Sequence, residues 1–357
     1  MDKLNLCVVF GGMSTEHDIS RISVTSILNK LNKEKYNIIV MGITKQGEWK
    51  LYTGDYDKIQ NGDWEKDTAN IKHAIISPDT ADKGIFVFED DKATKINVDV
   101  VFPVLHGAYG EDGTLQGLLE LAGIKYVGMG VLSSAVSLDK VYTNMICDYV
   151  NVPQAKWTYV TKAELDDMAS SVEKIETKLG YPCFVKPSNA GSSIGINKAH
   201  NRQELIDALK YAAQFDRKIV VEENIDGKEV ECAILGNYND VKASEIGRII
   251  PKVEFYDFEA KYEDDSTELM IPADVTDIER KTIQENAIKI FKALDGTGLS
   301  RADFFVRHSD GAVLFNEINT LPGFTSISMY PKLWEVSGIE YSALLDELIG
   351  LAQQRVK

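Results

Sequence analysis

Ser300-Arg301-Ala302-Asp303-Phe304-Phe305-Val306 is followed, after the polar turn His308-Ser309-Asp310-Gly311, by Ala312-Val313-Leu314-Phe315-Asn316-Glu317-Ile318-Asn319. Both runs have the residue pattern of strands, and the residues between them are typical of a tight hairpin turn. Side chains two positions apart on a strand share a face, so Arg301 accompanies Asp303, and Glu317 accompanies Asn319. The stretch therefore predicts a β-hairpin with one polar face.

Oxygen ligands dominate that face. Mg²⁺ commonly binds one or two carboxylates together with nucleotide phosphates, so Asp303, Glu317 and Asn319 predict a divalent-cation site. Arg301 on the same face would suit an oxyanion that develops during a reaction. Gly323, in the Pro-Gly turn that follows, offers a backbone N–H close by. Taken alone, the hairpin could equally present a solvated or salt-bridged face.

The length and composition of the chain are those of an ordinary globular protein. Its 357 residues predict two to three domains. It is 44% hydrophobic and 26% charged, and no apolar run is long enough to cross a bilayer. The first residues pass directly into an expected strand and lack the pattern of a signal peptide, so we expect a cytoplasmic protein.

The formal net charge of -16 argues against binding to nucleic acid or to an anionic membrane. An anionic substrate would therefore depend on a few locally placed cations. The four cysteines are widely spaced and show no paired zinc spacing, which predicts buried free thiols. They are Cys7, Cys147, Cys183 and Cys232.

The N-terminal part has the pattern of an open α/β sheet. A buried strand over residues 4–10 ends at Gly11-Gly12, and a helix follows Glu16. A second buried strand, over residues 98–105, ends at His106. Because ligands of such sheets bind outside the carboxyl ends of the strands, Glu16 and His106 are candidates, with His106 in a supporting role only. The glycine-rich loop 107–114 is either a flexible turn or a substrate loop.

The middle of the chain predicts a separate small α+β unit. A helix capped by Ser133 or Ser134 is expected to run to about Tyr149 and to contain Lys140. A strand ending near Lys186 then leads into loop 188–195, rich in Gly and Ser, which could bind phosphate through backbone N–H groups. A plain hairpin is the alternative, since neither a Walker A loop nor a Rossmann fingerprint occurs.

Two further segments have features of a nucleotide site. Glu222 and Glu223 end an expected strand and could present backbone groups to an adenine, with Glu229 accepting from ribose hydroxyls. The alternative is an ordinary acidic hairpin. The long aromatic connection 251–267, which contains Lys261 and Tyr262, is typical of a lid over a site. The helices expected over 277–294 and 341–351 have core-packing faces.

Taken together, motifs spread over nearly the whole chain resemble the D-alanine:D-alanine ligase family of ATP-grasp enzymes. They occur in the family's order, and each alone would be a weak signal. They are Gly11-Gly12-x-Ser14-x-Glu16, His106-Gly107, Gly110-Glu111-Asp112-Gly113, Lys186-Pro187, Gly191-Ser192-Ser193, Glu259-Ala260-Lys261-Tyr262, Arg301-x-Asp303 and Asn316-Glu317-x-Asn319-Thr320-x-Pro322-Gly323.

The resemblance implies an α/β and α+β fold of three domains: 1–139 for substrates, 140–230 as the central ATP-grasp part, and 231–357 with the lid and the metal site. It implies ATP and two divalent ions, Mg²⁺ or Mn²⁺, as cofactors, and a homodimer. The carboxylate of one D-alanine would attack the γ-phosphate of ATP, and the amine of a second D-alanine would attack the resulting acylphosphate.

The resemblance also implies residue roles. Nucleotide contacts would come from Lys140, Lys186, Glu222, Glu223, Glu229 and Lys261, and metal ligands from Asp303, Glu317 and Asn319. Glu16 would bind the first ammonium group and close the lid together with Ser192 and Tyr262. Arg301 and the Gly323 N–H would hold the oxyanion, and Ser328 the second carboxylate, near His106. Glu223 replaces a common lysine, so we expect it to contact adenine through its backbone.

The second substrate is predicted from Met329, which follows Ser328. An apolar side chain suits the methyl group of D-alanine and cannot hydrogen-bond the hydroxyl of D-serine. D-alanine is therefore favoured, with D-serine, and less so D-lactate, as alternatives. Another ATP-grasp ligase of different acid and amine, and a non-catalytic nucleotide-binding regulator, also remain open.

Overall fold

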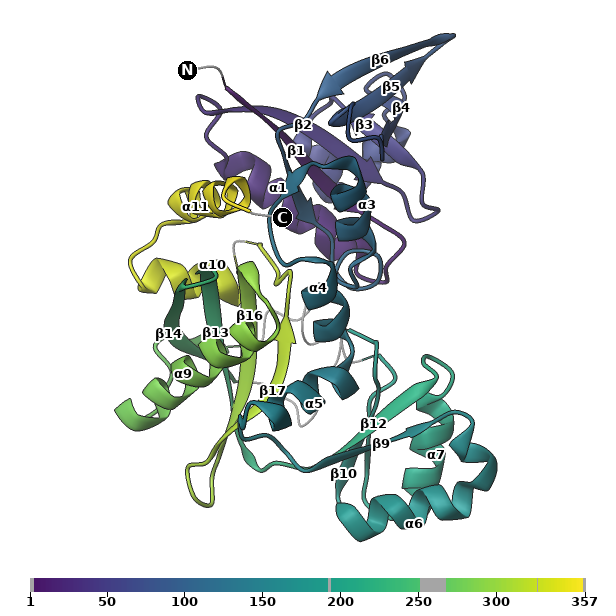
Figure 1. The fold of residues 1–357 in the computed structure, drawn as a ribbon, viewed down its shortest axis with the longest axis vertical. Coiled ribbons are helices and arrows are strands. Elements are labelled where there is room, and N and C mark those ends of the chain that lie inside the picture. The colour runs from purple at the N-terminus through teal and green to yellow at the C-terminus, as the bar shows by residue number, and fades with distance from the viewer. Residues whose placement is uncertain (1–2, 192–193, 251–267, 326, 356–357) are drawn as a thin grey trace.

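The computed structural model describes residues 3–191, 194–250, 268–325 and 327–355, and these residues form three β-sheets with helices packed against them. In Figure 1 the N-terminal sheet lies at the top, the C-terminal sheet below it, and the central sheet at the lower right. This arrangement agrees with the predicted three-part α/β and α+β fold.

The N-terminal sheet has eight strands in the order β6-β5-β4-β3-β2-β1-β7-β8. Only β1, β2, β7 and β8 pair in parallel. The antiparallel extension over β3 to β6 was largely missed by the sequence patterns, because its strands are short and β6 is almost wholly exposed. The strands are β1 (Leu4–Gly11), β2 (Tyr36–Ile43), β3 (Trp49–Tyr52), β4 (Ile71–Ile76), β5 (Gly84–Glu89), β6 (Lys92–Asn97), β7 (Val100–Val104) and β8 (Lys125–Tyr126).

Helices α1 (His17–Lys30), α2 (Tyr56–Asn61) and α3 (Thr114–Ala122) accompany this sheet, with a short 3₁₀ turn at Asp63–Lys66. The single helix expected to run to Tyr149 is wrong, because the chain forms α4 (Val131–Leu138) and α5 (Lys140–Tyr149) instead. Asp139 between them is extended, and its side chain accepts from the Tyr142 N–H at 3.4 Å as the cap of α5.

The central sheet is fully antiparallel, in the order β11-β10-β12-β9. Its apolar face packs on α6 and α7, and these residues form a core of their own. The elements are β9 (Trp157–Thr161), a 3₁₀ turn (Glu164–Asp167), α6 (Met168–Lys178), β10 (Cys183–Pro187), β11 (Asn197–Ala199), α7 (Arg202–Ala212) and β12 (Lys218–Glu223).

The C-terminal sheet has the order β15-β14-β13-β16-β17 and contains the predicted hairpin, β16 and β17. Its turn forms as expected, with Gly311 at φ +70° donating its N–H to the Arg307 carbonyl at 2.9 Å. The elements are β13 (Gly227–Asn237), β14 (Asp240–Ile250), β15 (Glu268–Met270), α9 (Asp277–Ala293), β16 (Thr297–Arg307), β17 (Val313–Asn319), α10 (Met329–Val336) and α11 (Tyr341–Gln353).

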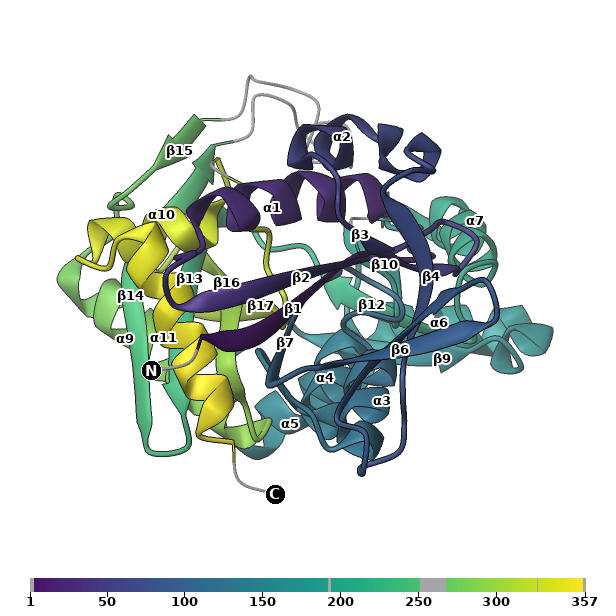
Figure 2. The same cartoon turned by 90° about the horizontal axis from the view of Figure 1, so that it is seen from above.

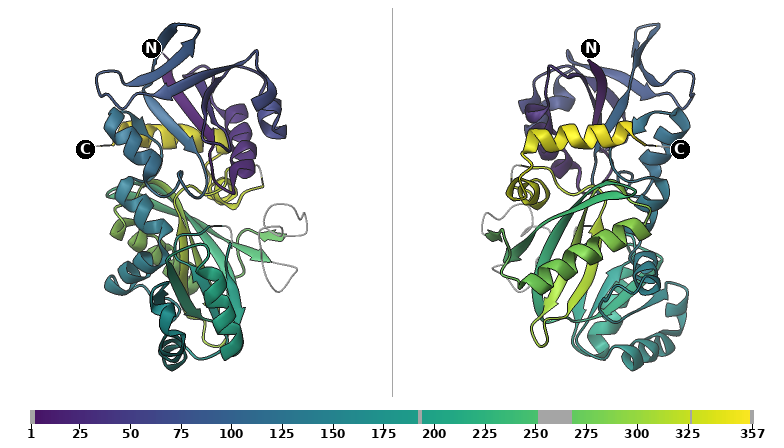
Figure 3. Two further views of the ribbon diagram at one scale, coloured as in Figure 1. Left: turned by 90° about the vertical axis from the view of Figure 1, so that its right-hand side faces the viewer. Right: turned by 60° about the vertical axis from the view of Figure 1, so that its left-hand side comes forward.

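The N-terminal and C-terminal sheets share one hydrophobic core. Side chains of β1 and α1, such as Phe10 and Ile27, belong to the same buried cluster as Leu235 of β13 and Leu345 of α11. Figures 1 and 3 show α11, in yellow, lying between the N-terminal strands and the C-terminal sheet, and in Figure 2, seen from above, α11 lies in front of the C-terminal strands. These two parts are therefore packed as one body, whereas the central sheet has a separate core.

Two of the expectations from composition concern general properties. The four cysteines are buried free thiols, as predicted, and burial raises the pKa of Cys7 to about 12. Among the described residues, none of the helices combines the length and apolar character that a bilayer crossing requires.

Candidate active site

The hairpin β16–β17 places the predicted metal ligands next to one another. Asp303 pairs directly with Glu317 across the two strands, and Arg301 pairs with Asn319 in the next row. The amide nitrogen of Asn319 donates to Asp303 at 3.1 Å, which leaves its carbonyl oxygen as the end that could take a cation. A bulge after Asp303 leaves Asn316 as the extra residue of β17.

Arg301 holds the Asp303 carboxylate through two parallel hydrogen bonds, from Nε to Oδ1 and from a terminal nitrogen to Oδ2, both at 2.7 Å. Its Nε also lies 3.0 Å from Oε2 of Glu231. Burial acts to lower the pKa of Arg301, but the carboxylates around it outweigh burial and hold its pKa well above the ordinary value. The guanidinium is therefore a fixed positive charge at this site.

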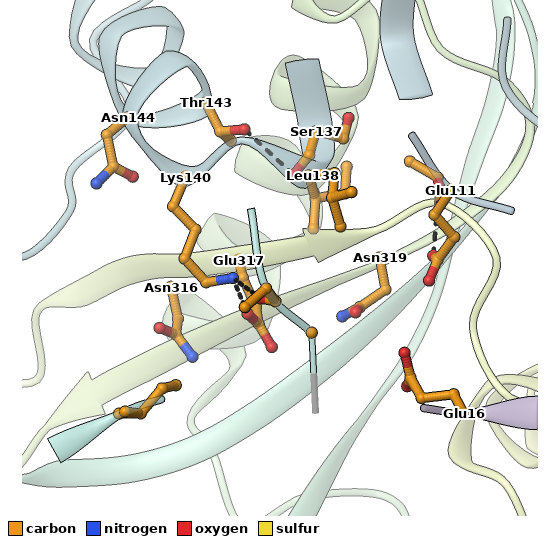
Figure 4. A pocket seen from close by; sticks show the side chains of 15 residues that line it. Glu16, Glu111, Ser137, Leu138, Lys140, Thr143, Asn144, Asn316, Glu317 and Asn319 are labelled. Atoms are coloured by element: carbon orange, nitrogen blue, oxygen red, sulfur yellow. Dashed lines mark hydrogen bonds and ion pairs between the residues drawn. The ribbon is translucent and has the colours of Figure 1, made fainter. Parts of the chain in front are cut away.

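A cavity opens beside this hairpin (Figure 4). It brings together residues from the N-terminal loops, from the α4–α5 segment, from loop 188–195 and from β17. Of the predicted site residues, it contains Glu16, Lys140, Glu317 and Asn319. Its lining is Glu16, Glu111, Ser137, Leu138, Lys140, Thr143, Asn144, Ala190, Gly191, Ile196, Asn316, Glu317, Ile318, Asn319 and Thr320.

Lys140 is the first residue of α5 and extends into the cavity (Figure 4). Its Nζ donates to the Ala190 carbonyl at 2.8 Å and lies 3.8 Å from Oε2 of Glu317. Lys140 therefore links loop 188–195 to the metal-ligand hairpin. This is the position that a cation needs in order to hold an anionic group between the two segments.

The N-terminal edge of the cavity is formed by the loops after β1 and β7, as the sheet topology predicts. Glu16 is buried there, and a Cβ atom on Gly107 would meet its Oε2 at 2.4 Å, while one on Gly191 would meet it at 3.2 Å. A side chain at Gly107 would therefore displace the Glu16 carboxylate, and one at Gly191 would crowd it. Glu16 thus lies where the N-terminal sheet approaches loop 188–195.

His106 lies beneath this edge, outside the cavity lining. Its Nδ1 donates to the Leu321 carbonyl at 2.9 Å, and Nε2 accepts from the hydroxyl of Ser23 at 3.2 Å. Burial lowers the pKa of His106, although Glu16 and the Leu321 carbonyl act in the opposite direction. In this structure His106 holds the loop after β17 in place, in keeping with a supporting role.

Glu111 faces the same cavity, and the sequence reasoning gave it no role of its own. Its carboxylate accepts from the N–H groups of Gly107 and Leu321, each at 2.8 Å. Burial, together with the nearby Glu16 carboxylate, raises the pKa of Glu111 to about 7. The available signal was its place in the glycine-rich loop directly after a buried strand.

The predicted nucleotide residues of the central part lie on β10, β12 and the start of β13. Glu222 is buried, and its Oε2 accepts from Lys186 Nζ at 2.7 Å, so its side chain is bound to a lysine. Glu223 donates its N–H to the Lys156 carbonyl at 2.9 Å. Glu229 is exposed at the start of β13. Burial acts to lower the pKa of Lys186, but Glu222, Glu317 and Glu229 raise it. Because Glu317 lies on β17, Lys186 also interacts electrostatically with the hairpin.

The loop after β17 contains Gly323 and leads to Ser328, the cap residue of α10. A Cβ atom on Gly323 would meet Ser328 Oγ at 2.9 Å, so these two predicted residues are neighbours. Met329 is buried in the core, and a Cβ atom on Gly247 of β14 would meet its sulfur at 2.5 Å. Its contact with a second substrate stays a prediction, since its side chain packs into the protein here.

Three predicted residues, Ser192, Lys261 and Tyr262, lie outside the residues that the structure describes. Within the described ranges, no group of three or more His, Cys, Asp or Glu side chains is arranged to hold a metal ion. The predicted set has only two carboxylates, and its third member is an amide. Asp303, Glu317 and Asn319 offer hard oxygen donors on adjacent strands, which fits Mg²⁺ or Mn²⁺.

Two segments that the sequence reasoning did not select support the site. The buried carboxylate of Asp139 binds Lys218 and accepts from Ser188 Oγ at 2.5 Å. Ser188 in turn accepts the Lys140 N–H at its carbonyl, at 3.0 Å. Glu231 beside Arg301 is the other. Both could have been suspected only from strand alternation or from a charge inside an apolar run.

Comparisons with known families agree with this geometry. The family described as D-ala D-ala ligase N-terminus matches residues 5–129, and the one described as D-ala D-ala ligase C-terminus matches residues 146–350. A D-alanine–D-alanine ligase of Acetivibrio thermocellus is 51% identical, covering 99% of this chain and 97% of the relative. D-alanine–D-alanine ligase B of Clostridium tetani is 50% identical, covering 99% of this chain and 94% of the relative.

Solved structures show the same likeness over the whole chain. The VanG D-Ala:D-Ser ligase from Enterococcus faecalis has a TM-score of 0.90 at 40% identity and covers 98% of this chain and 100% of that one. The D-alanine–D-alanine ligase from Coxiella burnetii has a TM-score of 0.84 at 35% identity, with 99% and 95% covered. The chain therefore belongs to the D-alanine–D-alanine ligase family.

Proposed function

We propose that this chain joins two D-alanine molecules into D-alanyl-D-alanine, with cleavage of ATP to ADP and phosphate, for the synthesis of peptidoglycan precursors. The observation that supports it most is the cavity in which Glu16, Lys140 and the β17 residues Glu317 and Asn319 meet. An ammonium-binding carboxylate, a phosphate-binding lysine and oxygen ligands for a cation are the three requirements of such a reaction.

In the first step, Glu16 holds the ammonium group of one D-alanine. The carboxylate of that D-alanine attacks the γ-phosphate of ATP, the bond to the β-phosphate oxygen breaks, and ADP and an acylphosphate result. Lys140 and Lys186 hold the phosphates, with Lys261 at the transferring group. The backbone at Glu222 and Glu223 faces the adenine, and Glu229 accepts from the ribose hydroxyls.

In the second step, the amine of the second D-alanine attacks the acyl carbon and phosphate leaves. Arg301 and the Gly323 N–H hold the developing oxyanion, because a guanidinium fixed by Asp303 needs no reorganisation when the charge forms. Ser328 binds the carboxylate of the second D-alanine, with His106 and Met329 near that subsite. Ser192 and Tyr262 join Glu16 in closing the lid.

Asp303, Glu317 and Asn319 would hold Mg²⁺ or Mn²⁺, which when bound neutralises charge on the β- and γ-phosphate oxygens. We place two ions there. Arg301 and Lys140 lie against these acids in the described structure, so the protein's own cations balance the ligand carboxylates.

The three-domain division 1–139, 140–230 and 231–357 is part of the proposal. The first boundary coincides with the break between α4 and α5 at Asp139. Because β13 (Gly227–Asn237) pairs with β14 and β16, we move the second boundary to the connection between Glu223 and Gly227. A homodimer is also proposed, on the family resemblance alone.

The test is Mg²⁺-dependent phosphate release from ATP with D-alanine alone, followed by identification of the product by mass. We expect D-alanyl-D-alanine, and no turnover without D-alanine. Absence of ATP cleavage with any D-amino acid would contradict the proposal and favour a nucleotide-binding regulator or a ligase of another acid and amine.

D-serine as the second substrate is a second candidate, because the VanG D-Ala:D-Ser ligase matches this chain with a TM-score of 0.90. The same assay decides it when D-serine, and in parallel D-lactate, is added to D-alanine. Turnover only with D-serine would assign the chain to that activity. Efficient turnover with D-alanine alone would instead assign the chain to D-alanyl-D-alanine formation.

A further inference from the structure

Glu231 lies at the proposed active site and has no part in the reaction described above. It is on β13, two residues after Glu229, and its side chain is only 6% exposed. Arg301, its neighbour, is already bound by Asp303 through two hydrogen bonds. Because removing a carboxylate from water is costly, a second buried acid beside the same guanidinium requires a compensating interaction.

Strand pairing explains how Glu231 reaches this place. Glu231, Asp303 and Glu317 pair with one another across β13, β16 and β17, so three carboxylates form one row of the sheet. The next row consists of Ala233, Arg301 and Asn319. Like charges directly opposite one another repel, so the acidic row needs a cation.

Arg301 supplies that cation from the neighbouring row. Ala233 beside it is fully buried and small, which leaves the long arginine side chain room to turn toward the acids. Its Nε lies between two oxygens, 2.7 Å from Asp303 Oδ1 and 3.0 Å from Glu231 Oε2. One of its terminal nitrogens donates to Asp303 Oδ2 at 2.7 Å. Arg301 therefore has two carboxylate partners on one edge.

Only one of those partners is a proposed metal ligand. A divalent cation on Asp303 competes with Arg301 for the same two oxygens, because each oxygen has limited capacity to accept. If Asp303 were the sole partner, Arg301 would oppose binding of the cation and would lose its position once the cation had bound. Glu231, on the far side from Glu317, keeps a carboxylate at Nε throughout.

We propose that Glu231 is a positioning residue that holds Arg301 in place when the Asp303 carboxylate turns to a divalent cation. This inference rests on the proposed function, in which Asp303 is a metal ligand and Arg301 contacts the oxyanion. It has two consequences. Glu231 favours binding of the cation, and it preserves the orientation of Arg301 in the loaded enzyme.

The first test is a titration of the full chain, saturated with ADP, with Mn²⁺. Electron paramagnetic resonance measures the bound Mn²⁺, and no turnover is needed. Glu231→Gln keeps the shape but removes the charge, and we expect the apparent Kd of Mn²⁺ to rise by about 3- to 10-fold, which is in the lower part of the range of coupling between contacting residues. The kcat should fall while the KM for ATP changes little. Glu231→Asp keeps the charge on a shorter arm and should give intermediate values, so the proposal stays testable if the Gln variant folds poorly.

The second test repeats the titration in an Arg301→Met background. If Glu231 acts through Arg301, Glu231→Gln should then have no further effect on the Kd of Mn²⁺. An equal loss in both backgrounds, or an unchanged Kd in the single variant, would overturn the proposal.

Glu245→Gln is the matched control. Glu245 lies on the neighbouring strand β14, and its Oε1 is 3.0 Å from Nε of Arg280, outside the cavity. This variant should leave Mn²⁺ binding unchanged. Failure of the wild-type chain to form D-alanyl-D-alanine would contradict the proposed function instead, and the Mn²⁺ titrations would still decide the role of Glu231.

Discussion

Two carboxylates, Glu16 and Glu111, face the same cavity from the loops that follow β1 and β7. Glu111 has two backbone N–H donors, at Gly107 and Leu321, and yet its pKa is raised to about 7, because burial and the Glu16 carboxylate outweigh those donors. At near-neutral pH the charge of this cavity therefore depends on one proton on Glu111.

The sign of the effect on stability follows from this pKa. Between the ordinary pKa of a glutamate and about 7, the folded protein keeps a proton that the unfolded chain releases. The contribution of Glu111 to the free energy of unfolding is therefore lost as pH rises through that window. The full change is on the order of 3 kcal/mol.

We expect the difference in free energy of unfolding between the wild type and Glu111→Gln to vary with pH between about 4.5 and 7, with the variant gaining relative stability as pH rises. Urea denaturation at a series of pH values measures it. His106, whose pKa is lowered, changes stability in the opposite direction, but it is present in both proteins and cancels. A difference that is constant with pH would contradict the assignment.

At the scale of elements, the break between α4 and α5 fixes the position of Lys140. Asp139 caps α5 and also binds Lys218 of β12, while Ser188 at the end of β10 accepts the Lys140 N–H. The side chain of Lys218 lies 4.3 Å above the ring of Tyr142 in α5. One buried ion pair thus connects the helix that presents Lys140 to the central sheet.

Lys218→Met should destabilise the protein by about 3 kcal/mol, because it leaves the buried Asp139 carboxylate without its cation. Thermal and urea denaturation would measure the loss. Lys281→Met is the control, since Lys281 and Glu285 form an exposed pair at 3.8 Å on α9, and its effect should stay within about 0.5 kcal/mol. Equal effects of the two substitutions would show that the Asp139 pair contributes no more than a surface pair.

At the scale of the whole molecule, the N-terminal and C-terminal sheets share a core, and Arg355 adds polar contacts between them. Its guanidinium lies 3.9 Å from the Tyr126 ring centroid at β8 and donates to the Gly128 carbonyl at 2.6 Å. It also donates to the hydroxyl of Thr297 at the start of β16, at 3.0 Å. The last part of the described chain therefore holds the first sheet against the third.

Arg355→Ala should lower the free energy of unfolding by about 2 kcal/mol, because it removes charge-assisted hydrogen bonds and a cation–π contact. Arg202→Ala provides the comparison, since Arg202 pairs with Glu176 at a side-chain exposure of 61% within the central part alone, and should cost at most about 1 kcal/mol. Urea denaturation followed by circular dichroism measures both. A smaller effect at Arg355 than at Arg202 would argue against its role between the sheets.

Elements whose signal is local could be predicted from the amino-acid sequence. The hairpin of residues 300–319 could be predicted because strand alternation fixes which side chains share a face. Arg301 and Asp303 share a face as expected, and they also form a hydrogen bond. The buried strands β1 and β7, and with them the placement of Glu16 and His106 at one edge of a sheet, followed from continuous apolar runs. The ordered set of motifs was sufficient to identify the family.

Which distant residues meet depends on tertiary packing. In the folded protein Glu222 pairs with Lys186, Asp139 with Lys218, and Glu231 with Arg301. The side chain of Met329 lies in the core. Nothing in the local pattern of those segments specifies a partner, because ion pairs between elements depend on how sheets and helices pack. The spacing of residues along a strand fixes the face on which a charge lies, whereas packing fixes the charge that it meets.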